Sequence, residues 1–179
     1  MKADQMWFDV VAPEFNNLNI GSIYGTESNV VGRKIKIQTT EIKELKQRAG
    51  YSLTFVINEV AEKNTCKAAI ETLELSREQL SKFVKHGIRK IDLSFKINLG
   101  GKDYAIKIVF SIRKTYHRYI TYIVKTLEQI INEKIQDYDL KKLIVSIMDE
   151  KIQTDIKKEL NKIYPIKALE IRMVSPYKG

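Results

Sequence analysis

The sequence predicts an α+β fold in which an antiparallel sheet, or a partly closed β-barrel, has helices on one side. Apolar and polar residues alternate repeatedly between residues 34 and 112, as is typical of strands. From Thr115 onward the apolar residues recur at spacings of three and four, as is typical of helices. A last alternating stretch through Leu169 and Ile171 returns to the strand pattern. Strands followed by helices and a final strand favour the α+β class.

The first half of the chain predicts short strands and short helices. Aromatic residues among Asn, Gly and Pro over residues 1–30 predict an irregular or edge segment, followed by a single α+β domain over residues 31–179. Strand patterns follow at residues 34–38, 51–57 and 66–70. Thr40 is typical of the cap of a short helix, and Ser76 is typical of the cap of the next, with Phe83 and Val84 on its apolar stripe.

The second half predicts a long hairpin and three helices. Residues 91–99 and 104–112 alternate around Gly100-Gly101, which indicates a hairpin with a tight turn. A long helix is predicted near residues 115–135, with Tyr116 and Tyr119 on its apolar stripe and therefore in the core. Two further C-terminal helices are predicted to begin at Asp139 and Asp149.

The composition is that of an ordinary globular chain. The 179 residues are 44% hydrophobic and 30% charged, with 8 Gly and 3 Pro, which excludes collagen-like and largely disordered classes. The longest apolar runs are far below the roughly 20 residues of a membrane span. Acidic residues inside the opening stretch are unlike a signal peptide. We therefore expect a cytoplasmic location and no membrane partner.

The residues that usually perform catalysis or bind metal are scarce. Cys66 is the only cysteine and alternates with Ala68 and Ile70, which predicts a small buried strand residue. His86 and His117 are the only histidines, so no metal site and no cofactor are expected. No nucleotide-binding loop and no hydrolase motif is present. The sequence therefore predicts neither an enzyme nor a small-molecule substrate.

The positive charge is concentrated in one segment. The chain has a formal net charge of +9, and residues 85–118 contain nine Lys or Arg against two Asp, or +7. Clustered cations favour polyanions such as nucleic acid. A solvated lysine face is the alternative reading of the same pattern.

The densest cations surround the predicted start of the long helix. Arg113, Lys114 and Arg118 flank Thr115, the expected cap, and His117. A helix N-terminus is itself positive, so each cation there costs about 0.3–1 kcal/mol. Free backbone N–H groups and surrounding cations suit a phosphate, which predicts a phosphate contact at this turn. An unpaired, solvated turn is the alternative.

Five segments of the chain resemble one known protein family. They are residues 7–21, 32–33 with 41–42, 75–78, 112–115 and the collinear run 139–165. They resemble the archaeal and eukaryotic small-subunit ribosomal protein family called S-three-A-e, occur in the family's order and span essentially the whole chain. The short stretch before Trp7 and the end at Gly179 favour a compact archaeal-type member.

The resemblance implies a structural protein of the small ribosomal subunit, bound to its rRNA on the platform near the messenger exit. It implies rRNA, neighbouring ribosomal proteins and messenger RNA near the exit as partners. Combined with the charge pattern, it predicts RNA contact by the basic segment and by a second patch; the candidates are Arg33, Lys34, Arg89, Lys90, Lys107, Arg113, Lys114, Thr115, His117 and Arg118. Trp7 and Phe8 are expected either to pack into the body or to stack on an unpaired base.

Two other functions fit the same residues. One is a free-standing RNA-binding or ribosome-assembly protein that does not remain in mature subunits. The other is an RNA-processing enzyme in which His117 acts as a base and Arg118 steadies a phosphate.

Overall fold

A computed structural model describes residues 5–45, 48–62, 64–113 and 115–177 of the chain. Strands and helices both contribute, and the chain ends in a strand, which confirms the α+β prediction. The chain forms two compact units, residues 1–72 and residues 73–179. The boundary falls inside β5 (Thr65–Leu75) and not at residue 30. The prediction of one domain over residues 31–179 stays a prediction.

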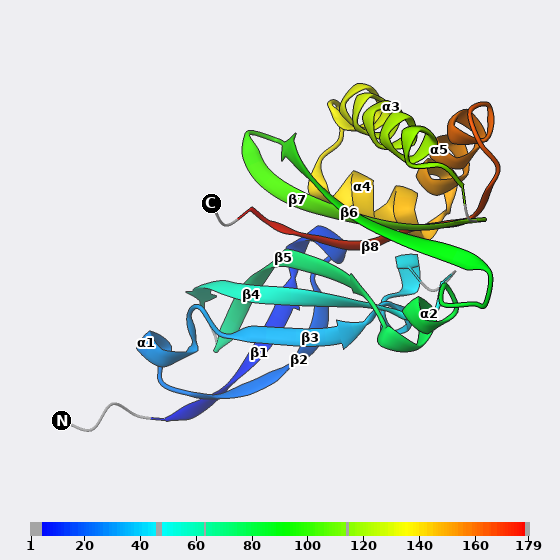
Figure 1. Ribbon diagram of the computed structural model, residues 1–179. Helices are drawn as coiled ribbons and strands as arrows, with labels where there is room; N and C mark the ends of the chain where they lie inside the picture. The colour runs from blue at the N-terminus through cyan, green and yellow to red at the C-terminus, as the bar shows by residue number, and fades with distance from the viewer. Residues whose placement is uncertain (1–4, 46–47, 63, 114, 178–179) are drawn as a thin grey trace. The chain divides into compact units, whose positions relative to one another are not determined.

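The first unit is an open arrangement of strands (Figure 1). β1 (Met6–Ala12) and β2 (Leu18–Gly25) form an antiparallel hairpin around a short 3-10 helix (Pro13–Phe15). β1 also pairs in parallel with β5, which pairs with β4 (Tyr51–Ala61) as well. β3 (Lys34–Gln38) pairs antiparallel with β4, and α1 (Glu27–Val30) lies between β2 and β3 in the chain.

Residues 1–30 were expected to form an irregular or edge segment, and their described part is mostly a regular hairpin whose strand β2 lies at the edge of the sheet. Along β1, Phe8 and Val10 are fully buried, whereas Trp7 and Asp9 are exposed. This alternation of buried and exposed side chains is the pattern of a half-buried strand. Of the Asn and Gly residues that suggested irregularity, Asn16 and Asn17 lie at a turn with φ values of 54° and 55°, whereas Asn19, Gly21 and Gly25 lie within β2.

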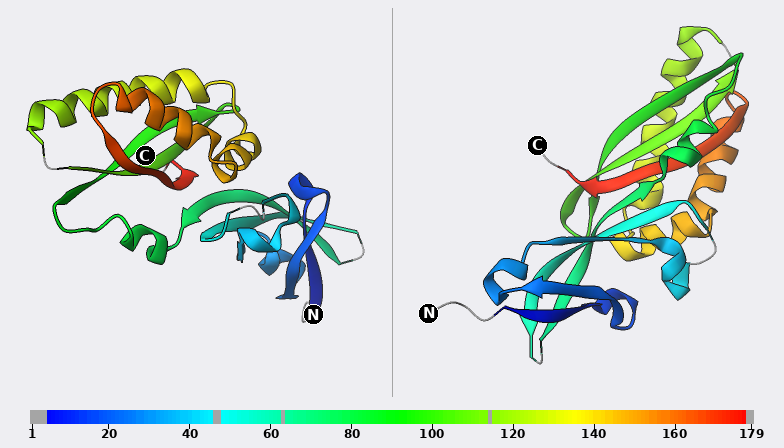
Figure 2. Two further views of the ribbon diagram at one scale, coloured as in Figure 1. Left: turned by 90° about the vertical axis from the view of Figure 1, so that its right-hand side faces the viewer. Right: turned by 90° about the horizontal axis from the view of Figure 1, so that it is seen from below.

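The second unit contains three long antiparallel strands and most of the helices. β6 (Ile88–Leu99), β7 (Lys102–Arg113) and β8 (Ile166–Pro176) pair in that order, and β8 also pairs with the end of β5. The helices are α2 (Arg77–Ser81), α3 (His117–Ile135), α4 (Leu140–Met148) and α5 (Lys151–Asn161). α3 and α5 lie side by side over one face of the sheet (Figure 2). The open strand order agrees with a sheet and not with a closed barrel.

β7 supplies the centre of the core of the second unit. Its residues Ile106, Ile108, Phe110 and Ile112 are fully buried. The register places Phe110 between Ile91 of β6 and Leu169 of β8. On α3, the stripe predicted from the spacing is confirmed where Ile123 and Leu127 are fully buried.

Of the four helix starts expected from Ser76 onward, two are confirmed and two are wrong. Ser76 precedes α2, and its hydroxyl accepts a hydrogen bond from the backbone N–H of Gln79 at 3.4 Å. Asp139 precedes α4 as expected. Glu150, with a φ of 58°, precedes α5 in place of Asp149. Tyr116 precedes α3 in place of Thr115.

Near residue 40 the structure has two single turns of 3-10 helix instead of one α-helix. They span Thr39–Glu41 and Lys43–Leu45. The first begins after Gln38, so Thr40 is not its cap. The apolar stripe expected on α2 is also only partly present, because Phe83 is buried but Val84 is 71% exposed. Val84 lies beyond the end of α2 at Ser81, so helical spacing no longer governs its direction.

The predicted hairpin turn is confirmed, and it depends on glycine. Gly100 and Gly101 have φ values of +56° and +82°. No heavy atom lies within 4 Å of a Cβ built on Gly101, so a substitution there would be strained by its backbone only. We expect Gly101→Ala to lower the free energy of unfolding by about 1–2 kcal/mol, the cost of a left-handed L-residue. Urea denaturation measures this, with Gly100→Asn as the milder control because Asn tolerates that conformation.

Candidate nucleic-acid interface

The net positive charge of the chain lies entirely in one of the two units. Residues 1–72 contain nine Lys or Arg and nine Asp or Glu, so the first unit has no net charge. Residues 73–179 contain 22 Lys or Arg against 13 Asp or Glu, so the second unit has the whole net charge of +9. A polyanion is therefore attracted to the second unit.

Both acids of the basic segment are already paired. Asp92 on β6 forms an ion pair with Arg172 on β8, with the guanidinium nitrogen and the carboxylate oxygen 2.9 Å apart. Asp103 on β7 lies 2.7 Å from the ammonium of Lys96 and also accepts from the side-chain amide of Asn98 at 3.0 Å. Neither carboxylate is left to neutralise the remaining cations of the segment.

Seven cations of residues 85–118 have no acid within 4.0 Å among the residues that the structure describes. They are Lys85, Arg89, Lys90, Lys102, Lys107, Arg113 and Arg118. All except Lys107 are exposed, and Lys107 is half-buried.

Five of these cations lie near the end of the second unit where β6 and α3 begin and β7 ends (Figures 1 and 2). Arg113 pairs with Ile88, so Lys90 is its diagonal neighbour on the same face, about 7–8 Å away. Arg89 points to the opposite face, since successive strand residues alternate. We call Lys85, Arg89, Lys90, Arg113 and Arg118 the basic end.

The first turn of α3 has the charge pattern that a bound anion would relieve. It contains no acid, and Tyr116 at its start makes no side-chain capping bond. The Arg118 guanidinium lies 5.0 Å from the centre of the Tyr119 ring and 5.7 Å from the centre of the Tyr116 ring. His117 is exposed, and its Nδ1 lies 3.2 Å from the hydroxyl of Thr121.

The prediction that Tyr116 lies in the core is wrong. Its side chain is 74% exposed, because it precedes α3 and the helical spacing does not apply to it. Tyr119 is half-buried against Tyr164, with ring centres 5.9 Å apart. Tyr122, which we did not single out, is 58% exposed. Its position off the apolar stripe was the signal that predicts this exposure.

The other predicted contact residues are distributed differently. Thr115 is half-buried and does not cap α3, and Lys114 lies outside the described residues. Lys107 is six residues along β7 from Arg113, which corresponds to about 20 Å. The structure therefore does not bring Lys107 into the basic end.

The second predicted patch lies in the neutral first unit. The Arg33 guanidinium donates to the backbone carbonyl of Tyr24 at 3.0 Å. The Lys34 ammonium lies 2.5 Å from the carboxylate of Glu71. Both cations thus have a partner within their own unit.

The two candidate stacking residues differ in exposure. Phe8 is fully buried, so the prediction that it stacks on a base is wrong and its alternative, packing into the body, is right. Trp7 is 64% exposed and lies against Tyr24, with ring centres 5.4 Å apart. The register explains this contact, because Trp7 is directly opposite Tyr24.

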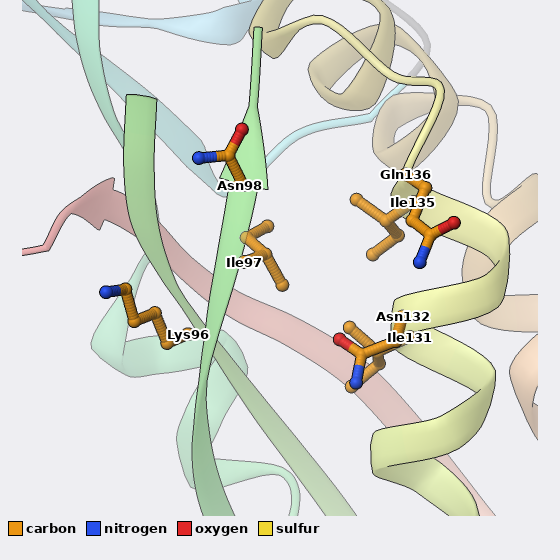
Figure 3. A pocket seen from close by; sticks show the side chains of 7 residues that line it. All are labelled: Lys96, Ile97, Asn98, Ile131, Asn132, Ile135 and Gln136. Carbon is orange, nitrogen blue, oxygen red and sulfur yellow. The ribbon is translucent and has the colours of Figure 1, made fainter. Parts of the chain in front are cut away.

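A cleft of about 320 Å³ lies between β6 and the C-terminal half of α3. Ile97, Ile131 and Ile135 give it apolar walls, and the amides of Asn132 and Gln136 lie at its α3 side (Figure 3). Its one cation, Lys96, points away from the cleft and is paired with Asp103 (Figure 3). The cleft therefore has no free charge with which to hold a phosphate.

Chemistry other than anion binding receives little support from the geometry. Burial raises the pKa of the Cys66 thiol, which keeps it protonated and unreactive. No group of three or more His, Cys, Asp or Glu side chains that could hold a metal ion occurs among residues 5–177 as far as they are described. In the same part of the chain, no helix is both long and apolar enough to cross a membrane.

The pair at the hairpin turn gives a pH-dependent prediction. Hydrogen bonds from Lys96 and then Asn98 lower the pKa of Asp103 below its ordinary value. The stabilisation is therefore present above the ordinary carboxyl pKa, and it is lost as the pH falls through the lower value of the folded state. We expect Lys96→Gln to raise the pKa of Asp103 toward its ordinary value. Carboxyl NMR titration below about pH 5 measures this shift, and an unchanged midpoint would contradict it.

A two-unit α+β protein with one neutral and one basic unit is the class that the fold and charges define. The family model described as the Ribosomal S3Ae family matches residues 3–178. Small ribosomal subunit protein eS1 of Haloarcula marismortui is 28% identical over 93% of this chain and 79% of its own length. The protein of the same name from Archaeoglobus fulgidus is 28% identical over 94% of this chain and 82% of its own length. The chain belongs to the Ribosomal S3Ae family.

Proposed function

We propose that this protein is a structural constituent of the small ribosomal subunit and that its basic end binds rRNA phosphates. The family match over residues 3–178 is the main support for the ribosomal role. The relatives from Haloarcula marismortui and Archaeoglobus fulgidus, both named small ribosomal subunit protein eS1, agree with it. In this role the partners of the protein are rRNA and neighbouring ribosomal proteins. The protein lies in the cytoplasm, on the platform of the small subunit near the messenger exit.

The charges support the basic end as the main RNA contact. Its five cations have no acidic partner among the described residues, and they lie in the unit that has the entire net charge. Arginine and lysine bind phosphate oxygens by charge-assisted hydrogen bonds. Such contacts position a protein on RNA without reading its sequence. The shape of the rRNA would therefore select the site.

The remaining candidate residues make additional RNA contacts in this proposal. Arg33 and Lys34 form a second contact in the first unit, where part of their charge is already used by Tyr24 and Glu71. Lys107, on the middle of β7, contacts RNA only if the RNA extends along the sheet. Trp7 remains a proposed stacking residue because its ring is exposed.

Purification of small subunits tests the ribosomal role. We expect the protein to remain with small subunits washed at high salt, at close to one copy per subunit. An assembly protein would instead be found with precursor particles and be missing from mature subunits. Finding the protein only with precursors would replace our proposal by the assembly function.

Incubation with labelled rRNA tests the enzymatic alternative. His117 has a hydroxyl, that of Thr121, as its hydrogen-bond partner among the described residues, whereas a general base is usually oriented by a third group. We therefore expect intact rRNA after prolonged incubation. Cleavage that disappears in His117→Ala would show a nuclease.

A further inference from the structure

Two aromatic rings at the start of α3 are not used by the core: Tyr116 precedes the helix and Tyr122 lies in its second turn. Tyr116 and Tyr122 are 74% and 58% exposed, although both rings have large apolar faces. Arg118 lies between them in the chain, one helical turn before Tyr122. Its guanidinium is 5.7 Å from the centre of the Tyr116 ring and 5.0 Å from that of the half-buried Tyr119. Residues four apart share one face of a helix, with a rise of about 6 Å between them.

The surroundings of these rings are cationic. Arg113 precedes them, and Lys125 is exposed one turn after Tyr122. The first acid of α3 is Glu128, about 15 Å along the helix axis from Arg118. Neither Arg118 nor Lys125 has an acid within 4.0 Å among the described residues.

The other exposed aromatic residues have different surroundings. Trp7 and Tyr24 lie in the neutral unit, with Asp9 two residues from Trp7 on the same strand face. Tyr177 is 47% exposed beneath the ammonium of Lys96, but that cation is paired with Asp103. Exposed rings and unpaired cations therefore coincide at the start of α3.

We propose that Tyr116, Arg118 and Tyr122 form a platform on which unpaired bases of bound RNA stack. Aromatic rings and guanidinium planes stack on splayed bases of single-stranded RNA, and cations beside them hold the connecting phosphates. Single-stranded RNA uses both features at once, because its bases stack on the rings while its phosphates pair with the cations. This inference rests on the proposed function, because it assumes that the basic end binds RNA.

RNA without bases provides the test. The protein is titrated, by fluorescence anisotropy, into a labelled 12-nucleotide uridine RNA and into the same backbone with abasic nucleotides. The variants are Tyr116→Ala/Tyr122→Ala, Tyr116→Phe/Tyr122→Phe and, as the matched exposed tyrosine, Tyr177→Ala. All three replace exposed side chains, and circular dichroism melting verifies that they fold.

We expect the double Ala variant to bind the uridine RNA about tenfold more weakly or worse, given what stacking contributes per base. Its affinity for the abasic RNA and its salt slope should match those of the unchanged protein. The double Phe and Tyr177→Ala variants should behave like the unchanged protein. Stacking therefore predicts an affinity loss that salt does not alter.

Three results would overturn the platform. One is equal affinity of the unchanged protein for both RNAs, and a second is an equal loss on both RNAs in the double Ala variant. The third is no binding of the uridine RNA at all. If the protein were absent from small subunits while the uridine preference persisted, the ribosomal role would fail and the platform would stand.

Discussion

Replacing Arg89, Arg113 and Arg118 by Gln should weaken rRNA binding by about two orders of magnitude at 0.1 M salt. Each phosphate contact releases about 0.7–0.9 counterion, so at this salt each contributes a factor of about 5–8 to the affinity. The three arginines belong to the basic end and have no acidic partner among the described residues, so their full charge is available to RNA. Filter binding at several salt concentrations should show the log–log slope becoming shallower by about 2–3.

A charge-matched variant distinguishes the effect of where the cations lie from the effect of net charge on RNA binding. Lys142, Lys151 and Lys162 also lie in the second unit, but each has an acid within 4.0 Å. Changing these three to Gln removes the same charge, and we expect less than a fivefold loss. The midpoint of thermal unfolding should stay unchanged in the arginine variant. Relief of repulsion at the start of α3 and loss of the Arg118 ring contacts are opposing effects of similar size.

Equal losses in the two triple variants would contradict the basic end as the contact surface. They would indicate that RNA responds to the overall charge of the second unit only. Undiminished affinity in the arginine variant would place the contact on another surface.

Replacing Phe110 by Ala should lower the free energy of unfolding by about 3–5 kcal/mol, as expected for a large buried aromatic residue. Phe110 is fully buried on β7, the middle strand of the β6-β7-β8 sheet. Its ring lies between Ile91 and Leu169 in the register, so its removal leaves a cavity beside both neighbouring strands. A total stability of about 5–15 kcal/mol makes this a large fraction of what holds the fold together.

Guanidinium denaturation, followed by circular dichroism, measures the loss. Val84→Ala is the control, because a 71% exposed side chain should change the stability by less than about 0.5 kcal/mol. A loss under 1 kcal/mol for Phe110→Ala would mean that the ring is not enclosed as the structure has it. A loss near 4 kcal/mol would support β7 as the centre of the core.

The β6-β7 hairpin illustrates what could be predicted from the chain alone. Alternation over twelve residues on each side of Gly100-Gly101 predicts the register of the hairpin and one buried face. The turn and both strands follow from that pattern, but the burial of Val109 and Ser111 on the other face of β7 does not. The family resemblance was likewise visible in short segments, and the match over residues 3–178 confirms it.

The candidate site was predictable only in part. The cations of residues 85–118 were visible as a cluster, but their pairing was not. Arg172 is 80 positions from Asp92, and only the β6-β7-β8 register brings them together. The helical spacing wrongly predicted Tyr116 in the core, because α3 begins only at the next residue. Lys107 was included for its charge, although β7 extends about 20 Å between it and Arg113.

The amino-acid sequence alone determined the class of fold, the strand and helix periods and the excess of positive charge. These properties depend on which residues follow one another, because a period of two or 3.6 is local to the backbone. The tertiary structure decided where the charge is free to act. It divided the chain into a neutral and a basic unit, paired both acids of the basic segment and exposed Tyr116 and Tyr122. Charge neutralisation and burial act through space, so they depend on strands and helices that are distant in the chain.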